Sequence, residues 1–186
     1  MNQELITNLL RYFSRFVPVA VLKETMIQPD LSQFPGYAQI QAEILANPAL
    51  PVRIPDIEKF ILSINEKFVS ERIKNSKGVI LFVEYAQIEA NFKKVNGIKQ
   101  SIAISVAHNF SDSNHDNLNE TILMNRCLHI LMTILRQMIE DQGQIDFCPH
   151  IDLVTMPVDI CVIDPKYFYG CTGWCAFFQN SNTILL

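Results

Sequence analysis

Apolar residues recur at helical spacing in the first third of the chain. The pattern over residues 3–17, which Pro18 ends, predicts an amphipathic helix, and a short helix is expected over 37–46. Pro55 suits the first position of a further helix that ends at Gly78. One apolar stripe supports that helix, and it comprises Ile57, Phe60, Ile61, Ile64 and Phe68.

After Gly78 the pattern changes to β-branched and aromatic runs. Residues 79–92 and 101–110 predict two strands, and Asn96-Gly97 between them is the strongest short hairpin signal. A two-residue loop places residue 95 opposite residue 98, although a β-bulge would shift this register. One face of the hairpin then carries Val79, Leu81, Val83, Tyr85, Ile102, Ile104 and Val106. The other face carries Ile80, Phe82, Ile88 and Phe92 beside the small residues Ser101, Ala103, Ser105 and Ala107.

The strongest helical pattern of the chain spans residues 116–141. Its polar side chains occupy about a third of the circumference at about 100° per residue. They are Asn125, Arg126, His129, Thr133, Arg136, Gln137 and Glu140. A helix that lies on a sheet with its back in water needs a narrower apolar face. We therefore expect this helix to be covered on two sides, by the N-terminal helices or by a neighbouring subunit.

Two strand-like segments, 151–163 and 167–180, close the chain. Pro157 indicates an edge position or a break in the first, and Gly170 and Gly173 are candidate bulge points in the second. The order of elements predicts an α+β fold with N-terminal helices, a mostly antiparallel sheet with a long β-hairpin, and one long helix packed on the sheet. Residues 1–54 are expected as a helical segment and 55–186 as an α+β domain, together forming one compact unit.

Composition and charge indicate which binding partners and which cellular compartment are expected. The 186 residues suit one domain, and a 49% hydrophobic content with a net charge of −4 argues against disorder and against a basic nucleic-acid-binding face. No apolar run is long enough for a membrane span, and the N-terminal pattern is not that of a signal peptide. The five cysteines are therefore expected as free thiols in the cytoplasm.

Two cysteines near the C-terminus raise the question of a metal clip. On a regular strand, Cys171 and Cys175 lie on one face about 13 Å apart, too far for one zinc ion or a disulfide. A tight turn at Thr172-Gly173 would bring them together, and Cys148 and His150 could then complete a four-ligand zinc set. The simpler interpretation is that both thiols fill small buried positions.

The segment 108–116 groups several residues that could bind a metal or form a hydrolytic site. They are His108, Ser111, Asp112, His115 and Asp116. The simpler interpretation is structural, because a strand ends here and a helix begins, and Asp112, Ser113, Asp116 or Asn117 could cap that helix. We assign no catalytic residue, metal ligand or cofactor from the sequence.

The order of elements, a leading helix, the 79–110 hairpin, the 116–141 helix and two closing strands, resembles the tail-terminator and head–tail connector proteins of tailed bacteriophages. The resemblance covers roughly residues 55–180 and rests on the pattern of elements without a shared motif, and residues 18–54 have no counterpart. It implies a small α+β subunit that forms rings at the end of a phage tail tube, from a phage or prophage. It also implies other virion proteins as partners and no catalytic residues.

The sequence therefore predicts a non-enzymatic structural subunit that forms a ring-like homo-oligomer in a phage tail or head–tail junction. Neither nucleic acid nor a membrane is an expected partner. The candidate self-interface comprises Ile80, Phe82, Ile88 and Phe92. The alternative is a small metal-binding or hydrolytic enzyme that uses the 108–116 loop or the set Cys148, His150, Cys171 and Cys175.

Overall fold

The computed structural model describes residues 5–26, 36–46, 53–64, 66–73, 76–90, 98–109, 116–141, 158–166 and 168–182. They form five α-helices and five β-strands in the order α1 (Leu5–Ser14), α2 (Val19–Thr25), α3 (Tyr37–Ala46), β1 (Ile57–Leu62), α4 (Glu66–Ile73), β2 (Val79–Ala90), β3 (Ile98–Asn109), α5 (Asn117–Asp141), β4 (Asp159–Ile163) and β5 (Cys171–Asn182). The predicted α+β class is confirmed.

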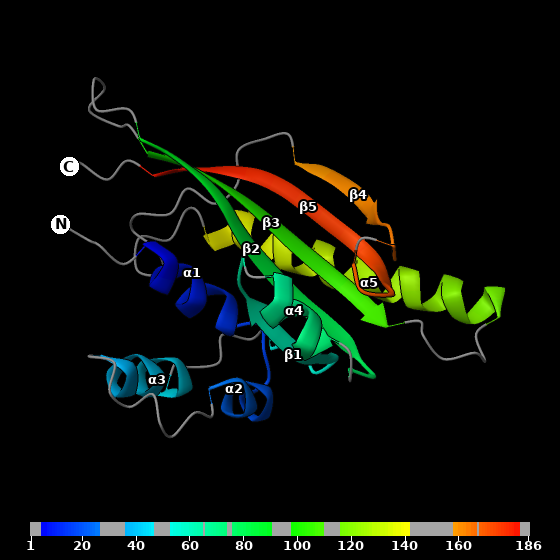
Figure 1. Cartoon of the computed structure of the whole chain (residues 1–186), viewed down its shortest axis with the longest axis horizontal. Coiled ribbons are helices and arrows are strands. Elements are labelled where there is room, and N and C mark those ends of the chain that lie inside the picture. The colour runs from blue at the N-terminus through cyan, green and yellow to red at the C-terminus, as the bar shows by residue number, and fades with distance from the viewer. Residues whose placement is uncertain are drawn as a thin grey trace.

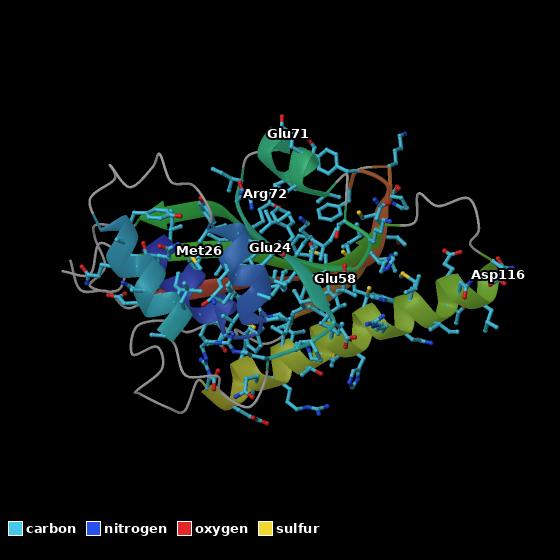
Figure 2. The ribbon with its side chains drawn as sticks, turned by 90° about the horizontal axis from the view of Figure 1, so that it is seen from below. Glu24, Met26, Glu58, Glu71, Arg72 and Asp116 are labelled. Carbon is cyan, nitrogen blue, oxygen red and sulfur yellow. The ribbon has the colours of Figure 1, made fainter. Side chains whose placement is uncertain are left out.

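The strands form one mixed sheet in the order β1-β2-β3-β5-β4 (Figure 1). β1 runs parallel to β2, and the other pairs are antiparallel. α4 connects the two parallel strands and packs on one face of the sheet, while α5 packs on the opposite face (Figure 2). We call these the α4 face and the α5 face.

The prediction of a helix that begins at Pro55 is wrong. Residues Ile57–Leu62 form strand β1, and a short helix follows as α4. The register between β1 and β2 shifts between Ile57 and Lys59, so a bulge places Ile57 and Phe60 in the same core although they lie three residues apart. This bulge produces the helix-like spacing of apolar residues within a strand.

The β2–β3 hairpin has the expected faces but a different register. Val79 pairs with His108, six positions from the expected partner, and a bulge between Tyr85 and Ile88 shifts the remaining pairs. Because side chains alternate with a period of two, an even shift leaves the faces unchanged up to Tyr85. Val79, Leu81 and Val83 accordingly pack in the core on the α5 face. The expected Asn96-Gly97 loop lies outside the described residues.

The long helix matches the prediction within one residue. Asp116 caps α5, since its Oδ1 accepts a hydrogen bond from the backbone N–H of Asn119 at 2.8 Å. The C-terminal half of α5 packs on the sheet, and its first turns extend past the sheet edge, where Asp116 marks the far end (Figure 2). Along the whole of α5, the buried side chains all lie within the segment from Cys127 to Asp141.

A single core joins the N-terminal helices to the α5 face of the sheet. Tyr12 and Phe13 of α1 and Phe16, which follows the helix, pack edge to face or tilted against one another. They lie in the same buried cluster as Ile134 and Met138 of α5. Tyr12 and Arg15 both contact Asp141, so the N-terminal segment covers the C-terminal end of α5. No helix among the described residues is long and apolar enough to cross a membrane.

Candidate functional site

A groove with a volume of about 660 Å³ opens on the α4 face. Its floor is made by two neighbouring rows of register partners across strands β2, β3, β5 and β4. The first row is Phe82, Ser105, Cys175 and Cys161, and the second includes Glu84, Ala103 and Phe177. Register partners point to the same side of a sheet, so the small side chains in the middle of each row create the hollow.

The walls of the groove come from two separate segments. Val69 of α4 lies on one side, and the turn between β4 and β5 lies on the other. In that turn, Phe168 packs on Phe82 with ring centroids 5.6 Å apart, and the N–H of Gly170 donates to the carbonyl oxygen of Pro165 at 2.9 Å. Tyr169 has a φ of 53°, a left-handed conformation that is uncommon for a tyrosine. These contacts fix the shape of this wall.

The polar groups that line the groove include two thiols, the carboxylates Glu84 and Asp164, and the amine of Lys166. Burial raises the pKa of the Cys175 thiol to about 11, although a hydrogen bond with the Ser105 side chain lowers it in part. Cys161, its register partner, is exposed. No histidine lines the groove, so a nucleophile paired with a histidine base is absent from this part of the described chain.

The alternative zinc site requires a tight turn at Thr172-Gly173, and that turn is not formed. Thr172 and Gly173 pair with His108 and Ala107 of β3, so they continue a strand and do not form a tight turn. Burial raises the pKa of the Cys171 thiol to about 12, and this residue fills a buried position as the simpler interpretation expected. Cys148 and His150 lie outside the described residues, among which no group of three or more potential metal ligands is found.

The bulge expected at Gly173 in the last strand is not formed. β5 pairs with β3 without a shift from Cys171 to Asn182. A Cβ atom at Gly173 would collide with the carbonyl oxygen of Val106 and with Ala107. The glycine is therefore required for the close approach of the two strands.

The 108–116 segment is described only at its ends. His108 is half-buried at the end of β3, with its Nδ1 2.9 Å from the carbonyl oxygen of Asn109. Asp116 caps α5, which confirms the structural interpretation for this residue. Ser111, Asp112 and His115 lie outside the described residues.

The expected self-interface on the hairpin is not an open surface. Ile80 and Phe82 lie on the α4 face as predicted, but they are buried in one cluster with Val69 and Ile73 of α4. The chain itself covers them, so they are not available to a neighbouring subunit. Phe92 and the side chain of Ile88 lie outside the described residues.

Exposed apolar side chains lie elsewhere, on β4 and on α5. The indole N–H of Trp174 donates to the backbone carbonyl of Met124 in α5 at 3.0 Å, so Trp174 lies on the α5 face. Val162 and Ile160 are the register partners of Trp174 and Ala176 and point to the same side. Their side chains are 54% and 36% exposed.

The neighbouring flank of α5 is open as well. One flank of the helix faces β1 and α1, because Arg126 pairs with Asp56 and the Tyr12 hydroxyl donates to Asp141. Met132 and Ile139 lie roughly half a turn away from that flank at about 100° per residue, on the other side of the buried stripe of α5. They are 42% and 45% exposed. We call Met132, Ile139, Ile160 and Val162 the open flank.

Sequence reasoning missed the open flank. The two residues of β4 were assigned to a strand, but their exposure depends on β4 being the last strand of the sheet. The expectation that α5 needs cover on two sides was the one available signal. Comparison with known proteins provides no further assignment, since no family model, no curated protein and no solved structure matches this chain.

Proposed function

We propose that this chain is a non-enzymatic structural subunit that assembles with copies of itself into a ring. The observation that carries the proposal is the open flank, since its four large apolar side chains, two from α5 and two from β4, are each more than a third exposed. Contiguous exposed apolar surface with a polar rim is typical of protein–protein interfaces. β4 is also an edge strand, and such edges offer unpaired backbone groups to a neighbour.

A second surface of the same chain fits the role of the opposing contact. The first turns of α5 extend past the sheet and expose Leu118 at 67% and Ile122 at 55%. We call this the projecting end. A contact between the projecting end of one copy and the open flank of the next joins two different surfaces. Repeated contacts of this kind form a ring when the rotation between neighbouring copies closes, and an open filament when it does not. We propose that this ring belongs to a phage tail or head–tail junction. The order of elements in this chain resembles that of the proteins that form such rings.

Absolute mass by light scattering on a sizing column, over a range of concentrations, tests the proposal. We expect a mass that is a multiple of 21.3 kDa, without bound metal. Val162→Asp and Leu118→Asp should each reduce the mass toward the monomer, because each places a charge in the contact. Ile64→Asp is the matched control, since Ile64 is exposed at 59% but lines the groove on the α4 face.

A mixture of the two interface variants tests whether the projecting end of one copy contacts the open flank of the next. Val162→Asp retains its projecting end and Leu118→Asp retains its open flank, so the mixture should contain a dimer at twice 21.3 kDa although neither variant associates alone. A wild-type monomer at every concentration would overturn the proposal. A monomer with stoichiometric zinc would instead support the metal-binding alternative.

A further inference from the structure

Two thiols face each other on the floor of the groove. Cys161 of β4 and Cys175 of β5 are direct register partners, and both are free cysteines. Partners in an antiparallel pair have Cα atoms about 4.5 or 5.5 Å apart, and both spacings fall within the roughly 4.4–6.8 Å range of disulfides. We propose that Cys161 and Cys175 are a redox modification site, which closes to a disulfide when the chain meets a low-molecular-weight disulfide such as oxidised glutathione.

The two thiols differ in a way that sets the order of the steps. Cys161 is exposed at the groove, whereas Cys175 is buried beside Ser105. Cys161 loses its proton to solvent and its thiolate attacks the small disulfide, which forms a mixed disulfide and releases one small thiolate. Cys175 then gives its proton to solvent and attacks the sulfur of Cys161, which releases the second small thiolate. The two released thiolates take up the two protons, so one small disulfide is reduced to two thiols as one protein disulfide forms.

The surroundings permit closure with little movement. Cβ atoms of register partners lie about 4.5–5.5 Å apart and must approach to about 4 Å. β4 is bonded to a neighbouring strand on one side only, so it can make this shift. The floor beside Cys175 is made of the small residues Ser105 and Ala103, which leave room for the second sulfur.

The other described thiols lack this arrangement. Cys171 is the register partner of Asn109, and Cys127 lies on α5. Both are buried, so a small disulfide in solvent does not reach them. Among the four cysteines that the structure describes, Cys161 and Cys175 alone are register partners.

The test counts free thiols in the full chain. The reduced protein is incubated at several ratios of reduced to oxidised glutathione, quenched with acid, unfolded and blocked with N-ethylmaleimide. We expect five adducts on the reduced chain and three on the oxidised chain, with a peptide pair that links Cys161 to Cys175. Addition of dithiothreitol should restore five adducts.

Single variants separate the two steps. Cys161→Ser should abolish the disulfide, and because this side chain is exposed the variant keeps its fold. Cys175→Ser should accumulate a stable glutathione adduct on Cys161 in place of the disulfide. Cys171→Ser is the matched control, since it removes a thiol from the same strand and should leave the Cys161–Cys175 link intact. Five adducts at every ratio, or a link to a different cysteine, would overturn the proposal.

Discussion

The buried ion pair between Arg15, which follows α1, and Asp141 of α5 gives the sharpest test of how the N-terminal segment stabilises the fold. Arg15 and Asp141 approach to 3.2 Å, and their side chains are only 5% and 4% exposed. Asp141 also accepts hydrogen bonds from the hydroxyl of Tyr12 at 2.8 Å and from the amide of Gln137 at 2.9 Å. The Arg15 guanidinium lies 5.0 Å from the centre of the Tyr12 ring. Asp141 is thus the carboxylate that these groups share.

Asp141→Asn removes the charge and keeps the shape of the side chain. The Tyr12 hydroxyl can still donate to the amide oxygen, so the main loss is the counter-charge of Arg15. Breaking a buried pair by removing one partner costs about 3–5 kcal/mol, because the remaining charge stays desolvated. In a chain of 186 residues, a loss of that size lowers the thermal midpoint by roughly 6–20 °C.

Thermal and urea unfolding, followed by circular dichroism, measure this loss. Glu43→Gln is the matched control, since it breaks the exposed Arg11–Glu43 pair and should leave the midpoint unchanged. Replacing both buried partners, with Arg15→Met and Asp141→Leu in one chain, should recover much of the lost stability because no charge remains buried. If Asp141→Asn behaves like Glu43→Gln, then the Arg15–Asp141 pair is hydrated and the reasoning is refuted.

Three further predictions concern packing, capping and ionisation. Gly173→Ala should lower the free energy of unfolding by about 1–3 kcal/mol, because the added methyl group meets the backbone of β3, and an unchanged urea midpoint would contradict this. Asp116→Ala removes the cap of α5 and should cost about 1 kcal/mol in the same assay, so equal stability would show that the cap contributes nothing. Burial raises the pKa of both Cys127 and Cys175 to about 11, above the value of 9.0 for a free thiol. The folded chain therefore holds more protons on these thiols than the unfolded chain between about pH 9 and pH 11. Their contribution to the free energy of unfolding should be constant below about pH 8 and fall above about pH 9, by up to about 1.4 kcal/mol per pH unit for each thiol. A flat profile to pH 10 under reducing conditions would refute this assignment.

The sequence specified those elements whose apolar pattern is local. The period of α5 follows from residues 116–141 alone, and the faces of the hairpin follow from strict alternation, which an even register error preserves. β1 could not be recognised in the same way. The bulge after Ile57 breaks the alternation, and the parallel pairing with β2 that stabilises the strand involves residues more than twenty positions away.

The groove and its thiol pair depend on features that no single segment contains. Cys161 and Cys175 meet because the turn between β4 and β5 has the length that places these two residues in register. This register follows from the whole turn, including the left-handed residues Tyr169 and Gly170. The position of β4 at the sheet edge then determines that Cys161 is exposed.

The two proposals can be tested independently because β4 alternates. Val162 and Ile160 point to the α5 face and belong to the proposed ring contact, whereas Cys161 points to the groove on the opposite face. Val162→Asp should therefore dissociate the oligomer and leave the Cys161–Cys175 disulfide able to form. Cys161→Ser should abolish the disulfide and leave the mass of the oligomer unchanged. If Val162→Asp abolished both, the most direct explanation would be that β4 has detached from β5, and a loss of protection of the β5 amides in hydrogen exchange would identify that outcome.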